Sequence, residues 1–260
     1  MPSFARQPLG LLSVMERRRA VTPVIEATAL SKRYGHRIVL NDVSFKVDQS
    51  EVCALIGPNG AGKSSLIRII LGLNKPTSGS VALFGKSEQK DLRQARERIG
   101  YVPDTTGAYL HLSAANNMRV RCAEWGLDSD KEVGCALRAV GLEDCGNKTV
   151  SQFSLGMKRR LDIGTALLGR TDLLVLDEPA NGLDPLGIEG IWSLIKRLNA
   201  EQGKTVLVSS HDLTELSRVA TSYLFICGGR LQKKVSSDEV RRSGKSLRDY
   251  YRHVMEKAIS

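Results

Sequence analysis

The sequence predicts an α/β fold built on a mostly parallel sheet, and three observations support this. Three short apolar runs have the length of strands: "VCALI" at 52–56, "LLVL" at 173–176 and "TVLVSS" at 205–210. Continuous apolar runs are typical of strands that are covered on both faces. Helical segments separate these runs, which favours crossover connections between parallel strands. Polar or glycine residues follow each run, and ligands of such sheets bind beyond the carboxyl ends of the strands.

The segment 1–23 has no sustained periodicity and is punctuated by prolines, so we expect an unstructured basic extension there. Its apolar run Leu9–Met15 is short, is followed by charged residues and lacks a small-residue cleavage site. It therefore does not indicate a signal peptide. The sequence leaves open whether Met1 or Met15 is the true start. Residues 24–260 are expected to form the folded domain.

The folded part opens with two alternating segments, "VIEATAL" at 24–30 and "VLNDVSFKV" at 39–47, which are typical of half-buried strands. After the run at 52–56 come a glycine-rich stretch and then "LIRIILGL" at 66–73, which predicts a helix. Asparagine, proline and glycine residues follow this helix and end it.

Residues 105–170 are mostly helical in character and predict a helical subdomain inserted between strands of the sheet. Ser113 is placed to cap the first of its helices, and 130–142 is amphipathic. In 153–170, four residues recur at helical spacing on one face: Met157, Leu161, Gly164 and Leu168. The C-terminal tail, 236–260, is also expected to be helical.

The composition indicates a globular protein that would need another chain to cross a membrane. Its 260 residues suffice to bury a sizeable core in one large domain or two small ones. No run approaches the roughly 18 apolar residues that a membrane-spanning helix requires. The five cysteines lack paired spacing. We therefore expect reduced thiols rather than a zinc site or a disulfide framework.

The net charge of +10 is concentrated at the two ends of the chain, with +3 in 1–23 and +5 in 230–260. Charge placed in this way is typical of solvated tails, and attraction to an anionic lipid surface is the alternative. It does not indicate a basic groove along the body of the protein, so no nucleic-acid partner is expected.

The stretch "GPNGAGKSS" matches the phosphate-binding loop pattern G-x4-G-K-[ST] in full, between a predicted strand and a predicted helix. Glycines let backbone N–H groups face an anion closely, and the helix that follows points its positive end at the same place. Lys63 adds a full charge near the β and γ phosphates, and Ser64 offers a hydroxyl to Mg²⁺. The candidate ATP-binding residues of the loop are Gly57, Pro58, Asn59, Gly60, Ala61, Gly62, Lys63, Ser64 and Ser65.

Two carboxylates follow the second apolar run. Asp177 ends that strand, where nucleotide hydrolases place a carboxylate that serves the metal ion. Glu178 comes directly after it and is a candidate to polarise the attacking water. Adjacent carboxylates repel unless a cation relieves them, which again predicts Mg²⁺. His211 follows the third apolar run at the same predicted edge of the sheet.

From about residue 24 to the C-terminus, the ordered motifs resemble the ATP-binding subunits of ABC transporters. The resemblance implies adenine stacking by Tyr34, a γ-phosphate-sensing role for His211, and a D-loop at "GLDP" that includes Asp184. It also implies a P-loop NTPase core with an N-terminal antiparallel β subdomain and an inserted helical subdomain. The family signature falls on Ser154, Leu155, Gly156 and Met157.

In this family two ATP-binding domains face each other, and each signature contacts the ATP held by the opposite phosphate loop. The resemblance therefore implies ATP and Mg²⁺ as ligands and a second copy or a related ATPase subunit as one partner. It implies an integral-membrane permease as another partner, and a peripheral location on the cytoplasmic face of the cell membrane. Ser154 can cap the helix that follows it, so that helix's free N–H groups can face the γ phosphate across the dimer.

Several residues depart from the family pattern. The family usually carries glutamine, a contact to Mg²⁺, where this chain has Asp104 after "GYVP". The signature has Leu155 and Met157 in place of glycine and glutamine. The Ser-Leu-Gly-Met form and the acid at the glutamine position resemble the exporter branch of bacitracin and lantibiotic resistance, which more often has glutamate there.

The favoured interpretation is an ATPase that powers a separate permease, exporting a peptide antibiotic or another small molecule. Two alternatives stay open: a soluble ABC ATPase acting on a non-transport partner, and a regulatory ATP-binding module with little turnover. Intact Glu178 and His211 argue against the regulatory module, whereas Asp104 and the altered signature argue slightly for it. No residue of this chain identifies the cargo, since substrate contacts would lie in the permease.

Overall fold

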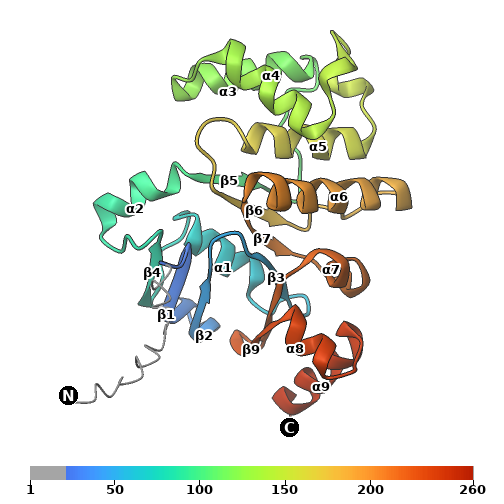
Figure 1. The fold of residues 1–260 in the computed structure, drawn as a ribbon. Helices are drawn as coiled ribbons and strands as arrows, with labels where there is room; N and C mark the ends of the chain where they lie inside the picture. Colours follow the sequence, from blue (N-terminus) through green and yellow to red (C-terminus); the bar gives the residue numbers. More distant parts are fainter. Residues whose placement is uncertain (1–21, 260) are drawn as a thin grey trace, which may run out of the picture.

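A computed structural model describes residues 22–259 of the protein (Figure 1). Within that range, the larger sheet has the strand order β5-β6-β7-β3-β8-β9. All neighbours in it pair in parallel, except that β8 and β9 form an antiparallel pair. The mostly parallel sheet expected from the sequence is therefore confirmed. Its strands are β3 (Val52–Ile56), β5 (Ile99–Val102), β6 (Leu173–Asp177), β7 (Thr205–Ser209), β8 (Ser222–Cys227) and β9 (Arg230–Ser236).

A second, antiparallel sheet has the order β2-β1-β4, with β1 (Ile25–Tyr34), β2 (Arg37–Val47) and β4 (Ser78–Leu83). Helix α1 (Lys63–Ile70) packs against this sheet and one face of the larger sheet, and the side chains of all three form one apolar cluster. The other face of the larger sheet belongs to a second cluster, shared with the long helices. Because both faces of β3, β6 and β7 are covered, these strands have continuous apolar sequences.

Three helices form the lobe at the top of Figure 1: α3 (Ala114–Trp125), α4 (Ser129–Val140) and α5 (Leu155–Ala166). Ser113 caps α3 as expected, since its side chain accepts a hydrogen bond from the Asn116 amide at 3.3 Å. On the predicted stripe of α5, Leu161 and Gly164 are buried. A Cβ at Gly164 would lie 2.6 Å from Met118 Cε and 3.1 Å from Val140 Cγ2, so a side chain there would displace these neighbours.

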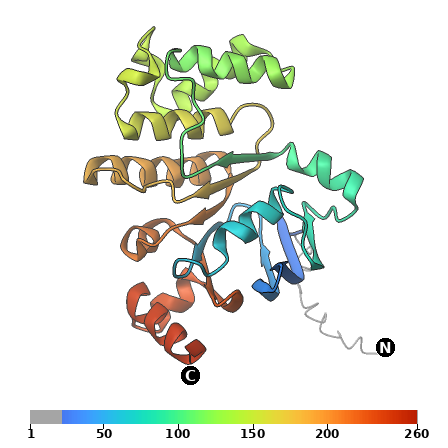
Figure 2. The ribbon, with the colours of Figure 1, turned by 180° about the vertical axis from the view of Figure 1, so that it is seen from behind.

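The opposite end of the molecule carries the C-terminal helices, which Figure 2 shows from the reverse side. The helix expected in the tail is formed by α9 (Leu247–Ile259). It docks on the sheet through aromatic packing, with the rings of Phe225 and Tyr250 stacked at 6.1 Å. The remaining elements are α2 (Gln89–Arg96), α6 (Pro185–Gln202), α7 (Leu213–Val219), α8 (Ser237–Arg242), η1 (Glu143–Cys145) and η2 (Val150–Gln152).

Two details differ from the sequence expectation or lie beyond it. Helix α1 begins at Lys63 and ends at Ile70, about one turn earlier at each end than the predicted 66–73, because the phosphate loop leads directly into its first turn. The expectation for the extension concerns residues that lie almost wholly outside the described range. Between residues 22 and 259, no helix is both long and apolar enough to cross a bilayer.

Candidate nucleotide-binding site

The glycine-rich loop connects the carboxyl end of β3 to the amino end of α1, and backbone crowding explains its glycines. A Cβ on Gly57 would lie 2.2 Å from the Ile226 carbonyl oxygen. Gly62 has φ +107°, and a Cβ there would lie 2.8 Å from the Val39 carbonyl oxygen. A side chain at either position would push the loop away from its neighbours. The loop therefore brings its amides, and the free N–H groups of α1, to the edge of the sheet.

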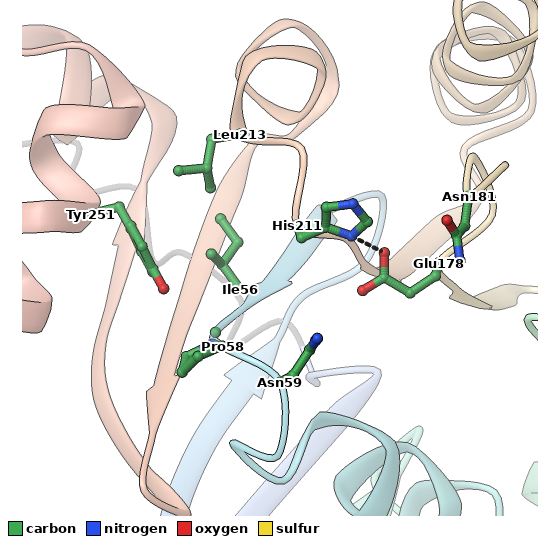
Figure 3. A pocket seen from close by; sticks show the side chains of 9 residues that line it. Ile56, Pro58, Asn59, Glu178, Asn181, His211, Leu213 and Tyr251 are labelled. Carbon is green, nitrogen blue, oxygen red and sulfur yellow. Dashed lines mark hydrogen bonds and ion pairs between the residues drawn. The ribbon is translucent and has the colours of Figure 1, made fainter. Parts of the chain in front are cut away.

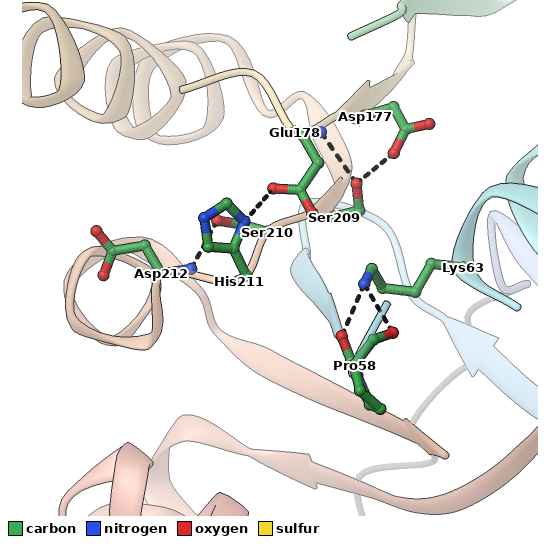
Figure 4. Close-up of polar contacts among 9 residues, drawn as sticks. Pro58, Lys63, Asp177, Glu178, Ser209, Ser210, His211 and Asp212 are labelled. Carbon is green, nitrogen blue, oxygen red and sulfur yellow. Dashed lines mark hydrogen bonds and ion pairs between the residues drawn. The ribbon is translucent and has the colours of Figure 1, made fainter. Parts of the chain in front are cut away.

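The Lys63 side chain lies inside the curl of this loop and is only 8% exposed. Its Nζ donates to the Gly57 carbonyl oxygen at 2.7 Å and to the Pro58 carbonyl oxygen at 3.3 Å (Figure 4). An ammonium group has three donors, so these two bonds hold the charge in place and leave one donor for another partner. The loop thus presents a fixed positive charge next to its own amides.

Asp177 and Glu178 lie on the neighbouring part of the edge, and both bond to Ser209. Ser209 Oγ, at the end of β7, donates to Asp177 Oδ1 at 2.6 Å and accepts from the Glu178 amide at 3.0 Å (Figure 4). Asp177 and Ser209 are paired in register between β6 and β7. Ser209 is not among the site residues that the sequence predicts. The sequence does hold a signal for it: Ser209 is a hydroxyl residue at the end of an apolar run, two positions before His211.

Glu178 and His211 form a close pair. Glu178 has φ +49°, an uncommon conformation for a residue with a side chain, and it turns the carboxylate away from the strand. His211 Nδ1 lies 2.9 Å from Glu178 Oε2. The Glu178 side chain is 19% exposed and the His211 side chain 69%. A proton on Nδ1 makes the imidazole a donor to the carboxylate and leaves Nε2 facing outward as an acceptor.

These groups border two hollows that share Asn59 and Glu178. In the first hollow, His211 and Glu178 approach from one side and Tyr251 of α9 from another, with the phosphate loop below (Figure 3). The second hollow runs along the loop from Asn59 to Ser65 and reaches β2 at Arg37 and Val39. Glu178 therefore lies between the loop and the histidine, at the junction of both hollows.

Other predicted residues lie away from this edge or at its margin. Tyr34 is exposed at the end of β1, and its hydroxyl accepts a hydrogen bond from Asn74 Nδ2 at 2.7 Å. It does not line either hollow. Asp104 is exposed in the segment after β5. Burial raises the pKa of the Tyr101 phenol, and the nearby charges of Asp177 and Asp104 raise it further. Both carboxylates therefore lie near the same ring.

The signature residues occupy a third hollow together with Asp184, and the phosphate loop does not line it. Ser154 caps α5, since its Oγ accepts from the Met157 amide at 3.2 Å. Asp184 caps α6 in the same way, accepting from the Gly187 amide at 2.8 Å. The exposed side chain of Leu155 also borders this hollow. The structure thus brings the signature and the D-loop together, but not against the nucleotide loop of the same chain.

The phosphate loop lies between the parallel strand β3 and helix α1, and two carboxylates lie at the end of β6, two strands away in the sheet. This arrangement defines a P-loop nucleoside-triphosphate hydrolase. Residues 40–181 match the family model described as ABC transporter. The chain belongs to this family and is an ATP-binding subunit, with ATP hydrolysis as its expected activity. The bacitracin transport ATP-binding protein BcrA of Bacillus licheniformis is 35% identical over 92% of this chain and 78% of that protein.

Two further relatives extend the comparison. The lantibiotic transport ATP-binding protein SrtF of Streptococcus pyogenes is 41% identical, over 81% of this chain and 90% of its own length. The solved dimeric structure of the ATP-binding cassette MJ0796, in a post-hydrolysis state bound to ADP and Pi, superposes with a TM-score of 0.71. It is 26% identical and covers 82% of this chain and 98% of that cassette. These likenesses confirm the fold class and the subfamily resemblance drawn from the sequence.

Proposed function

We propose that this subunit hydrolyses ATP at the phosphate loop with Glu178 as the general base, and that hydrolysis powers a separate integral-membrane permease. The observation that carries the proposal is the convergence of Lys63, the two carboxylates and His211 at one edge of the sheet. The subunit would work as a peripheral protein on the cytoplasmic face of the membrane, where ATP is available.

The donor set at this edge fits Mg²⁺. The Ser64 hydroxyl borders the loop hollow, and the Asp177 carboxylate lies at the neighbouring strand end. Both are the hard oxygen ligands that Mg²⁺ prefers. Ser209 engages Asp177 Oδ1, which leaves Oδ2 for a cation. Asp104 is a further candidate oxygen ligand. When bound, the ion would offset the negative charge on the phosphate oxygens.

Each residue then has a defined task. The loop amides and Lys63 bind the β and γ phosphates, and Tyr34 would stack on the adenine. Glu178 accepts a proton from the attacking water, and its fixed backbone directs the carboxylate into the hollow. His211 orients that carboxylate through Nδ1 and presents Nε2 toward the γ phosphate. Proton transfer of this kind contributes about 10²- to 10⁴-fold to a rate.

A second copy, or a related ATPase subunit, would complete the site. Ser154 and the free amides at the start of α5 are suited to an anion, yet they line a hollow separate from the phosphate loop of their own chain. A facing subunit in head-to-tail contact would bring them to the γ phosphate. Their positive potential would then stabilise charge in the transition state, so a lone subunit is expected to turn over slowly.

Export of a peptide antibiotic or another small molecule is the cargo class that we propose, because similar proteins are named for bacitracin and lantibiotic transport. The same relatives favour a transport role over a soluble ABC ATPase with a non-transport partner. The close contact between His211 and Glu178 favours a site with turnover over a purely regulatory ATP-binding module.

Glu178→Gln tests the central assignment. Glutamine keeps the size and the hydrogen-bonding capacity of the side chain but is not a base. The variant should bind ATP with unchanged affinity and lose steady-state turnover by at least about 100-fold. Glu189→Gln, an exposed change on α6, is the matched control and should hydrolyse ATP like the wild type. Turnover near the wild-type rate in Glu178→Gln would remove Glu178 from the role of general base.

A further inference from the structure

Helix α5 carries two buried charges that the nucleotide site does not use. The side chains of Arg159 and Asp162 are 4% and 8% exposed and lie one helical turn apart. Their closest approach, from Arg159 Nη1 to Asp162 Oδ2, is 3.9 Å, which is too long for a hydrogen bond. Arg159 Nε and Asp162 Oδ2 have no hydrogen-bond partner among the described residues. The two side chains are therefore held mainly by partners other than each other.

Both side chains instead hold the segment that follows β5. Arg159 donates to the Pro103 carbonyl oxygen at 2.7 Å and also to the Asp104 carbonyl oxygen. Asp162 Oδ1 accepts from Thr106 Oγ1 at 2.8 Å, and the nearby Gly107 amide favours the charged carboxylate. The cation binds the carbonyls at the start of the segment, and the anion binds the Thr106 hydroxyl near its end. Residues 103–106 are thus fastened to α5 at two points.

The charged form of this contact is expensive. Burial raises the pKa of the Asp162 carboxyl to about 6, although the Thr106 hydroxyl, the Arg159 charge and the Gly107 amide all lower it. Apolar residues of similar volume often replace buried ion pairs without loss of stability. Packing alone therefore gives little reason for these residue types. The partners of the two charges do give one, because the Pro103 and Asp104 carbonyls need donors and the Thr106 hydroxyl needs an acceptor.

The start of α5 and the segment fastened to it belong to different halves of the proposed ATP site. Ser154 caps the start of α5, five residues before Arg159, and it belongs to the signature. Asp104 lies in the fastened segment, and its charge acts on the same Tyr101 phenol as the charge of Asp177. A rigid link between them would connect the site that a chain builds for its own nucleotide with the group that it offers to the facing subunit.

We propose that Arg159 and Asp162 are positioning residues that fasten the Asp104 segment to α5, so that Asp104 and the signature move as one body when nucleotide binds. This inference rests on the proposed function, in which the signature acts across the dimer. Loss of the fastening leaves the phosphate loop intact, so ATP affinity stays the same while turnover falls. If these residues only stabilised the fold, replacing them would change the unfolding midpoint but would not lower turnover at unchanged ATP affinity.

The test uses Asp162→Leu and Thr106→Val, which each remove one side of the hydrogen bond between Thr106 and Asp162. Thr165→Val is the matched control, a change on the same helix at a hydroxyl outside this contact. We expect kcat to fall about 2- to 30-fold in the first two variants, the range for residues that couple sites without touching either ligand. The ATP dissociation constant, measured with a fluorescent analogue, should stay within about twofold.

Hydrogen exchange of the full-length chain, measured with and without MgATP in a Glu178→Gln background, gives a readout besides activity. In that background, MgATP should slow exchange in both 103–110 and 153–158. With Asp162→Leu added, 103–110 should still respond and 153–158 should not.

If 153–158 responds equally in both proteins and kcat stays at the wild-type value, the inference is wrong. If the unmodified chain fails to hydrolyse MgATP at all, the proposed function fails instead, so the two failures are distinguishable.

Discussion

The buried carboxyl of Asp162 makes the stability of the protein depend on pH in a defined direction. Its pKa lies near 6 in the folded chain, against 3.8 for the same group in the open, chiefly because burial disfavours the charge. Between about pH 4 and pH 6 the folded state therefore holds a proton that the unfolded chain has released. Folding is favoured by protonation here, so this contribution to stability rises as the pH falls through 6 and is lost above it.

The magnitude follows from the shift. A rise of about two pKa units corresponds to about 3 kcal/mol between the fully protonated and fully ionised limits. Other groups line the same hollow, and each can titrate or carry charge: Arg121, Tyr101 and Tyr109. Asp162 is the group of this hollow whose pKa lies near 6, so we assign the pH dependence to it.

Asp162→Asn removes the titration and keeps an oxygen that can accept from Thr106. The free energy of unfolding, measured by urea denaturation at several pH values, should be compared between the two proteins. The difference in unfolding free energy, wild type minus variant, should fall by about 3 kcal/mol from pH 4 to pH 7 and stay constant above pH 7. Asp130→Asn, an exposed change on α4, should give a flat difference throughout. Parallel curves for wild type and Asp162→Asn would refute the reasoning.

Two other predictions concern the nucleotide edge. Lys63→Ala should weaken ATP binding about 10- to 100-fold, because a charge-assisted contact is lost; a fluorescent-nucleotide titration measures this, with the exposed Lys196→Ala as control, and equal affinities would contradict the assignment. Ser209→Ala should lower kcat about 10- to 100-fold, because Asp177 loses its hydroxyl partner and the Glu178 amide keeps only its bond to the Ser209 carbonyl oxygen. Ser217→Ala, which removes a local bond within α7, should leave kcat unchanged. A normal rate in Ser209→Ala would show that the carboxylates hold their positions without it.

The central strands and the phosphate loop could be predicted because their physics is local. A strand that is covered on both faces has a continuous apolar sequence, and β3 accordingly has the predicted bounds, 52–56. The caps at Ser113 and Ser154 could be found because a hydroxyl before a helix bonds to an amide only three residues away. The glycines of the loop likewise belong to a motif with a fixed spacing.

Features that depend on which segments become neighbours could not be predicted in the same way. Ser209 acts through the pairing of β6 with β7, which no residue spacing encodes. Strand β5 is four residues long, too short to carry a period. Arg159 and Asp162 have the spacing of surface charges on an amphipathic helix. They are buried only because α5 packs over the segment that follows β5.

Two subunits are expected to share each ATP site, and dimer formation tests this most directly. Light scattering after size exclusion should give the mass of a monomer for Glu178→Gln without nucleotide and of a dimer with MgATP. Glu178→Gln/Ser154→Arg should stay a monomer while still binding nucleotide, because the signature no longer fits the facing site. A monomer of Glu178→Gln with ATP bound, or a dimer that forms regardless of Ser154, would contradict the shared site.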